Sequence, residues 1–272
     1  LLARSKKRNK QTMKDLKIRA SSLGRLMSND KDTSITDKQL VTLNGLLAKI
    51  KLTEKQAELR DVLLLKRDAK PQLSAGAKSY INELFMYKEF GVRQEINSKY
   101  IDKGNEVEEL AIEIAGIQLG YEGLVKNEDY FENDYIIGTP DVVNDEVLID
   151  VKSSWSASTF PFFDTTLKNN IYSWQLKAYM YLTGHTESYL CYCLVPTPED
   201  LILDEMRRVS WKRGELGEVS IETEADVRAY FDLSKIPTEK RVKAFKVELT
   251  AEDVEQIKEK VELAREYYKQ IK

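Results

Sequence analysis

Residues 135–152 have the sequence YIIGTPDVVNDEVLIDVK, and this stretch decides the fold. β-Branched and other apolar residues dominate Tyr135–Val143 and Glu146–Lys152, which is typical of strands. Asn144-Asp145 between them favours a tight turn. The stretch therefore predicts a β-hairpin.

Three charged residues of this hairpin fall on one face. A two-residue turn would place Asp141 opposite Leu148. Side chains alternate along a strand, so Leu148, Asp150 and Lys152 share that face. Asp141 and Asp150 are then diagonal neighbours, with Cβ atoms roughly 7 Å apart or less. Two carboxylates at this distance can share a hard cation, and such oxygen ligands select Mg²⁺ or Mn²⁺ over Zn²⁺. A longer turn would change this register.

The second strand supplies two further groups. Val151 turns toward the core, which leaves its backbone carbonyl free to act as a neutral ligand. Lys152 can stabilise the charge that develops on a phosphate, or it can hold the attacking water. The competing interpretation is an exposed hairpin with a Lys–Asp ion pair, which is common on protein surfaces. The D-x-K pattern alone does not decide between the two.

The helix that follows the hairpin carries two polar residues on one face. Gln175 and Tyr179 lie one turn apart, and the residues around them are nearly all apolar. This composition predicts a buried helix, and a buried glutamine needs hydrogen-bond partners. The ligands of the hairpin site or a DNA phosphate could supply them.

The helix that precedes the hairpin offers several acidic residues. Its apolar stripe, at 100° per residue, is expected to consist of Val107, Leu110, Ala111 and Ile114. Glu109 and Glu113 lie well away from this stripe. Glu108 falls on an apolar flank, between Ile112 and Ala115. It is either an edge residue that reaches solvent or a ligand that faces inward.

The remaining pattern indicates an α/β core with helical additions. Most of the first 120 residues are expected to be helical, with capping boxes at Thr36 and Thr53. Further elements are expected to be helices at Ala77–Phe90, Lys103–Gly120, Ile171–Thr183 and after Thr250, and strands at Ser188–Val195 and Arg241–Leu249. We expect one domain over residues 1–272, with a mainly helical part at 1–100, a core at 101–195 and a closing strand and helix at 196–272.

Composition limits the classes of function. The net charge is −3, but residues 1–27 hold nine Lys or Arg against one acid. A basic arm on an acidic body suits a protein that contacts phosphates, although a solvated tail fits residues 1–10 equally well. Two cysteines exclude a four-cysteine metal site, and one histidine excludes a His-rich site. No apolar run reaches roughly 18 residues and the N-terminus is basic, so we expect no membrane span, no secretory signal and a cytoplasmic location.

The order of these motifs resembles a known nuclease family. Residues 138–141 (GTPD), 149–152 (IDVK) and 175–179 (QLKAY) resemble the PD-(D/E)XK nucleases of the RecB-like branch, which carry a Q-x-x-x-Y motif. Residues 104–111 (GNEVEELA) and 18–21 (IRAS) are similar to segments of the YqaJ-type viral recombinases, the group of phage lambda exonuclease. The resemblance implies a restriction-endonuclease-like core, with a central mixed sheet flanked by helices and a helical N-terminal elaboration.

The resemblance also implies roles for individual residues. It implies a Mg²⁺ site, in which Mn²⁺ can substitute, formed by Glu108, Asp141, Asp150 and the backbone carbonyl of Val151. Lys152 would be the catalytic lysine. The residues expected to contact DNA or its phosphates are Ser21, Arg19, Lys14, Thr139, Gln175 and Tyr179. The basic residue of the phosphate pocket does not align cleanly, and Lys14, Lys17 and Arg19 are its candidates.

The function implied by the resemblance is a Mg²⁺-dependent deoxyribonuclease of phage-type recombination. It would degrade linear double-stranded DNA from its ends in the 5′→3′ direction, with a single-strand annealing protein as partner and a ring-shaped homotrimer as assembly. The direction rests on the resemblance alone. The residues fit a PD-(D/E)XK endonuclease of repair or restriction equally well. A different class, a DNA-binding or assembly module with vestigial acids, is opposed by the intact spacing of the four site residues.

Overall fold

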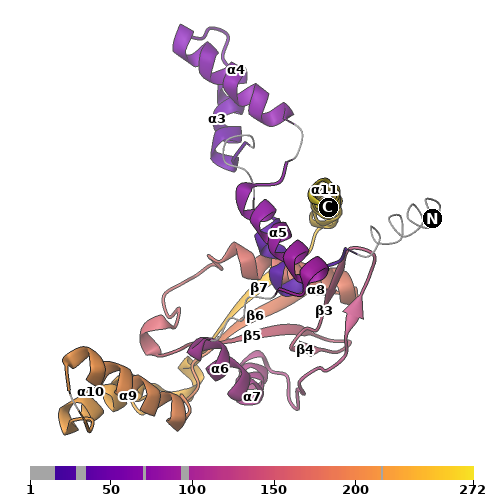
Figure 1. The fold of residues 1–272 in the computed structure, drawn as a ribbon. Coiled ribbons are helices and arrows are strands. Elements are labelled where there is room, and N and C mark those ends of the chain that lie inside the picture. The colour runs from indigo at the N-terminus through magenta and orange to yellow at the C-terminus, as the bar shows by residue number, and fades with distance from the viewer. Residues whose placement is uncertain (1–15, 29–34, 70–71, 93–97, 216) are drawn as a thin grey trace.

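The computed structural model describes residues 16–28, 35–69, 72–92, 98–215 and 217–272. Two small sheets lie at the centre of the molecule (Figure 1). One has the order β1-β3-β2 and consists of Ile18–Arg19, Ile136–Gly138 and Phe131–Glu132. The other has the order β4-β5-β6-β7 and consists of Val142–Val143, Leu148–Ser153, Glu187–Cys193 and Val242–Glu248. β1 pairs with β3 and β5 pairs with β6 in parallel, and the other pairs are antiparallel. The mixed sheets and their helices confirm the predicted α/β class.

Helices cover both faces of the four-stranded sheet. The helices are α2 Leu23–Leu26, α3 Asp37–Leu47, α4 Glu54–Asp68, α5 Ala75–Phe90, α6 Lys99–Glu106, α7 Glu108–Leu119, α8 Asn170–Thr183, α9 Glu199–Arg213, α10 Ile221–Phe231 and α11 Ala251–Ile271. Short 3-10 turns lie at Ala20–Ser22, Ala157–Thr159 and Thr238–Lys240. α5, α8 and α11 lie on one face of the sheet and α7 on the other (Figure 1). Within the described residues, no helix is long and apolar enough to cross a membrane.

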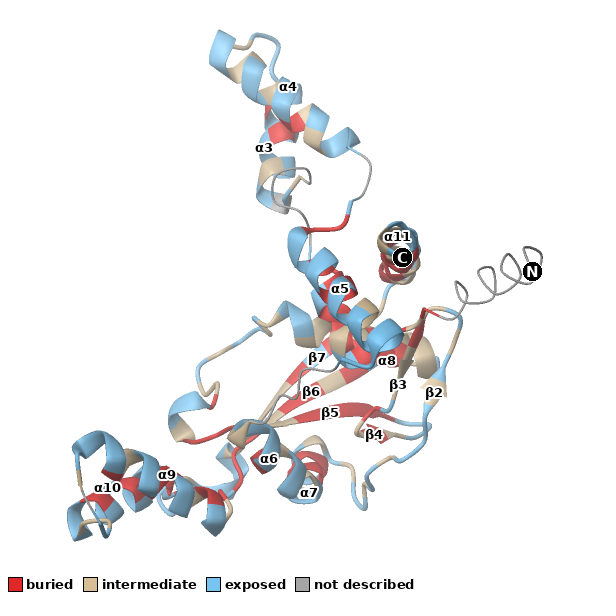
Figure 2. Cartoon of the chain, viewed as in Figure 1, coloured by how far each residue is buried: buried red, intermediate tan, exposed pale blue. Residues whose placement is uncertain are grey.

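Strand β5 divides the core in two, because its alternate residues point to opposite faces. Leu148 packs with α8, α5 and α11, whereas Ile149 and Val151 pack against α7. The buried positions follow this pattern along the central strands and the helix faces that cover them (Figure 2). Asp150 lies on the α8 side and is fully buried. The sheet therefore holds an acidic side chain in its interior, and that side chain needs partners.

The hairpin forms, but its turn differs from the expected one. Asn144 N–H donates to the carbonyl of Val147 at 3.1 Å, so the turn is centred on Asp145-Glu146 and not on Asn144-Asp145. The Asn144 side-chain oxygen accepts from the amides of Glu146 and Val147, and this local bonding fixes the turn. Val143 pairs with Leu148. Each partner is therefore two positions beyond the predicted one, and a shift of two leaves every side chain on its predicted face.

The predicted strand at 135–143 is wrong in its length. It consists of β3 and β4, which belong to different sheets and are separated by Thr139–Asp141. Pro140 lies in this break, and proline has no N–H to donate to a ladder. The break turns the chain between the sheets and leaves Asp141 directly before β4.

The predicted helix at 103–120 is also divided. α6 ends at Glu106 and α7 begins at Glu108, with Val107 between them in a non-helical conformation. The buried face of α7 consists of Ala111, Ile112, Ala115 and Gly116. Leu110 was expected on this face but is 41% exposed. The new helix start rotates the buried face toward Ile112 and Ala115, the two residues that flank Glu108.

Most other elements form where they were predicted. Thr36 and Thr53 form capping boxes, and Thr250 with Asp253 caps α11. α5, α8, β6 and β7 lie within a few residues of their expected bounds. The stretch 196–240 was not predicted in detail, and it contributes α9 and α10, which project from the body together (Figure 1).

Candidate active site

Asp150, Lys152, Gln175 and Tyr179 form one buried network. Asp150 Oδ1 accepts a hydrogen bond of 2.9 Å from Gln175 Nε2, and Asp150 Oδ2 forms an ion pair with Lys152 Nζ. Gln175 Nε2 also donates to the Tyr179 hydroxyl at 3.3 Å. β5 and α8 supply these four residues, because Asp150 and Lys152 lie on the α8 face and Gln175 and Tyr179 are one turn apart. The buried glutamine therefore has a carboxylate of the hairpin as a partner, as expected, and the Tyr179 hydroxyl as a second one.

Asp141 lies beside this network, directly before β4. Its Oδ2 accepts a hydrogen bond of 2.8 Å from the Val151 N–H. Burial raises the pKa of Asp141 to about 8, and repulsion from Asp150 adds to this effect, whereas Lys152 and the Val151 amide oppose it. Two buried carboxyl groups thus share one lysine ammonium, and a divalent cation would supply further positive charge.

Lys152 keeps its charge despite its surroundings. Burial lowers its pKa, but attraction by Asp150 and Asp141 outweighs this effect, so the net pKa lies above the ordinary value. Its ammonium also lies 5.3 Å from the centre of the Tyr172 ring, a cation–π distance. Lys152 is therefore a fixed cation that carries protons to donate at neutral pH.

Glu108 lies at the first position of α7 and faces the same cavity as Asp141 and Lys152. The cavity has a volume of about 510 Å³, and Val151, Tyr172 and Tyr192 also line it. The Glu108 side chain is 19% exposed and forms an ion pair of 2.6 Å with Lys126. Glu109 is exposed. The two adjacent glutamates therefore have different surroundings, and only Glu108 faces the cavity.

The donor set suits a hard cation, but its acids are engaged with lysines. No group of three or more acidic, histidine or cysteine side chains among the described residues is spaced to hold a metal ion. Asp150 is paired with Lys152 and Glu108 with Lys126. The Val151 N–H points toward Asp141, and the carbonyl of a strand residue points to the same side as its N–H, so this carbonyl also faces Asp141. The Asp141 and Asp150 side chains lie close enough to interact electrostatically, and carboxylate and carbonyl oxygens are the ligands that Mg²⁺ prefers.

The residues expected to contact phosphate do not form a single cluster, unlike the acidic residues and Lys152. Ser21 and Thr139 are exposed, and Lys14 lies outside the described residues. Arg19 faces a different cavity, on the opposite side of β1 from the buried Ile18. Both hydrogens of the Gln175 amide are engaged, with Asp150 and Tyr179. The structure brings together the acids, the lysine and the Q-x-x-x-Y pair, and it does not bring Arg19 to them.

Three residues near the site were not predicted from the sequence. Lys126 pairs with Glu108, and Tyr172 lies beside Lys152. Lys103 is 1% exposed, and its ammonium donates to the carbonyls of Ser154, Trp155 and Val195 and to the hydroxyl of Thr197. Tyr172 could have been found, since it lies three residues before Gln175 on the same helix. Lys103 lies four residues before Val107, so it continues the apolar stripe of this segment, and that position was a signal for burial.

Lys103 joins α6 to the ends of two central strands. Its four acceptors come from the segments that follow β5 and β6. Burial lowers its pKa to about 8. The ammonium therefore stays mostly protonated at neutral pH and fixes the chain two residues beyond Lys152.

The comparisons with known proteins agree with this architecture. The solved structure of a phage-related exonuclease from Haemophilus somnus 129PT has a TM-score of 0.66 and 26% sequence identity, over 94% of this chain and 95% of that one. An alkaline exonuclease from Laribacter hongkongensis has a TM-score of 0.50 and 14% identity, over 93% of this chain and 88% of that one, and shows the fold alone. No family model and no curated protein sequence matches the chain. The chain therefore shares the fold of the phage-related exonucleases, as its resemblance to the lambda exonuclease-like PD-(D/E)XK nucleases predicts.

Proposed function

We propose that the protein is a Mg²⁺-dependent exonuclease that hydrolyses linear double-stranded DNA, in the 5′→3′ direction. The observation that carries this proposal is that Asp141 lies beside the buried network in which Asp150 pairs with Lys152 and accepts from Gln175 of α8. The likeness to the phage-related exonuclease over nearly the whole of both chains supports it. The direction and the duplex substrate rest on the resemblance of the motifs.

We propose a task for each residue of the site. Asp141, Asp150 and the Val151 carbonyl would hold Mg²⁺, with Glu108 as a further ligand once it leaves Lys126. Bound Mg²⁺ would supply positive charge to a scissile phosphate and lower the pKa of a bound water. Lys152 lies on the same face and can donate a hydrogen bond to a non-bridging phosphate oxygen or to the attacking water. Gln175 fixes the orientation of Asp150, and Asp150 in turn fixes Lys152.

The proposal is tested with three DNA substrates in one time course. Linear duplex with 5′-phosphate should be degraded faster than the same duplex with 5′-hydroxyl, and covalently closed circles should survive. All cleavage should stop in EDTA, since the carboxylates would then lack their cation. Prompt conversion of supercoiled circles to linear product would instead establish an endonuclease, and no cleavage with any metal would indicate a binding module.

Partners are proposed on the resemblance alone. We expect the protein to act on DNA ends, to form a ring-shaped homotrimer and to work with a single-strand annealing protein. Light scattering coupled to size-exclusion chromatography tests the trimer, because a monomer has a mass of 31.4 kDa.

A further inference from the structure

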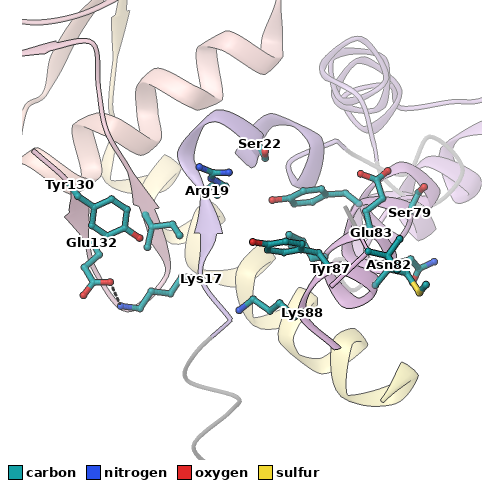
Figure 3. Close-up of a pocket in the computed structure, with 15 residues that line it drawn as sticks. Lys17, Arg19, Ser22, Ser79, Asn82, Glu83, Tyr87, Lys88, Tyr130 and Glu132 are labelled. Atoms are coloured by element: carbon teal, nitrogen blue, oxygen red, sulfur yellow. Dashed lines mark hydrogen bonds and ion pairs between the residues drawn. The ribbon is translucent and has the colours of Figure 1, made fainter. Parts of the chain in front are cut away.

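A second, larger cavity lies away from the catalytic residues. Its volume is about 1050 Å³, and β1, the segment around β2 and one face of α5 line it (Figure 3). Ile137 on β3 belongs to its lining and precedes Asp141 by four residues. These two Cα atoms lie at most about 14 Å apart, because an extended chain spans no more than about 3.6 Å per residue. One DNA molecule could therefore reach both places.

The cavity combines cations with exposed aromatic rings. Arg19 on β1 and Lys17, which directly precedes β1, lie between Tyr130 on one side and Tyr87 on the other (Figure 3). Tyr130 is 59% exposed and Tyr87 is 49% exposed, although tyrosine rings in a core would be covered. Ser22, Ser79 and Asn82 add neutral hydrogen-bonding groups to the wall. Aromatic faces next to cations are the combination that binds unpaired nucleotides, because every base can stack and every nucleotide carries a phosphate.

The charges in the cavity leave Arg19 available for an anion. Both carboxylates in the lining are paired already: Glu132 with Lys17 at 3.1 Å, and Glu83 with Arg25 at 2.7 Å. Within the described part of the chain, no carboxylate forms an ion pair with Arg19. Arg19 is exposed because its neighbour Ile18 takes the buried face of this short strand. A guanidinium held in a concave wall is a suitable donor for a phosphate.

We propose that this cavity binds a short segment of single-stranded DNA, with a base against Tyr130 and a phosphate on Arg19. The inference deepens the proposed function, on which it rests for the identity of the polymer as DNA. Single-stranded DNA is what an exonuclease leaves behind when it removes one strand of a duplex. The volume of this cavity is in the size range of small-molecule sites. The cavity can therefore hold a narrow, unpaired strand, but it cannot enclose an intact double helix.

The test measures binding without cleavage. The full chain is titrated in EDTA against a fluorescein-labelled oligothymidylate, and anisotropy gives Kd. Tyr130→Ala should raise Kd at least about fivefold, the low end of losing one base–aromatic stack, whereas Tyr130→Phe should stay close to wild type. Arg19→Ala should raise Kd and reduce the slope of log K against log salt by about 0.7, the value for one phosphate of a single strand. Trp211→Ala and Arg207→Ala, which change exposed residues of α9, are the matched controls.

The outcomes separate this inference from the proposed function. Equal Kd values for Tyr130→Ala, Arg19→Ala and the two controls would overturn the inference, whatever the nuclease activity. Competition by blunt duplex as strong as competition by unlabelled oligothymidylate would overturn it as well. Loss of oligothymidylate binding in the two cavity variants, in a protein that cleaves no DNA with Mg²⁺, would support the cavity and overturn the proposed nuclease. Intact cleavage with no binding of single strands by wild type would do the reverse.

Discussion

Substitution of Gln175 tests most sharply whether a buried residue acts in the site or only packs in the core. Gln175 is 7% exposed, and its amide donates both to Asp150 and to the Tyr179 hydroxyl. Gln175→Met keeps the length and most of the volume of the side chain and removes both donors. Asp150 would then lose the hydrogen bond from Gln175 and keep the ion pair with Lys152, in a fully buried position.

The size of the effect follows from these contacts. A hydrogen bond to a charged group contributes about 1.5–3 kcal/mol, and the 3.3 Å bond to Tyr179 adds less. If the full amount is needed to hold Asp150 in its reactive position, kcat should fall roughly 10- to 150-fold. The free energy of unfolding should fall by about 2–3 kcal/mol as well, since the carboxylate becomes less satisfied.

The assay is the initial rate of release of acid-soluble nucleotides from linear duplex, at saturating DNA and Mg²⁺. Circular dichroism and urea unfolding establish that the variant is folded under these conditions. Gln118→Met, at an exposed position of α7, is the matched control and should be active. A Gln175→Met protein with wild-type kcat and reduced stability would refute the reasoning, because the glutamine would then be a packing residue only.

Other predictions follow from the same contacts. Glu108→Gln should reduce cleavage severely and Glu109→Gln only mildly, because one side chain faces the cavity and the other is exposed; equal rates for the two variants would contradict the assignment. Lys152→Ala should lower kcat by a larger factor than it raises the Kd for DNA measured in EDTA, since we propose that Lys152 acts in the hydrolysis step and contributes less to holding the DNA. Lys103→Met should lower the free energy of unfolding by about 1–3 kcal/mol in urea, because it leaves buried carbonyls without their donor, whereas Lys212→Met should change it by less than about 0.5 kcal/mol.

Much of the site could be predicted because it depends on side-chain alternation. Asp150 and Lys152 share a face in any strand that contains them, and Asp141 joins them in every register that differs by an even number of residues. The exact register could not be predicted, because the side chain of Asn144 sets the turn one residue later. The alternation of side chains therefore predicts which face of the hairpin these residues occupy, but it does not predict which residues of the two strands pair.

Other features depend on contacts between distant parts of the chain. The apolar face of α7 was misplaced because a new helix starts at Glu108, and its docking on the sheet chooses Ile112 over Leu110. The burial of Lys103 depends on carbonyls that lie 51 to 92 residues away in the sequence. Arg19 was expected near the candidate active site by its place in a motif, but it points away from the core opposite Ile18. Helical and strand periodicity carry no information about such contacts.

The most direct measurement of the central claim is the rate of cleavage of 5′-phosphorylated linear duplex by wild type, Asp141→Asn and Asp150→Asn, with Mg²⁺ and with EDTA. Both substitutions keep the volume of the side chain and remove a charge from the pair of carboxylates. We predict cleavage by the wild type with Mg²⁺ only, and a loss of at least about 100-fold in each variant, with unchanged circular dichroism, since each would lose a ligand of the proposed cation. Cleavage by either variant at the wild-type rate, or by wild type in EDTA, would contradict the account.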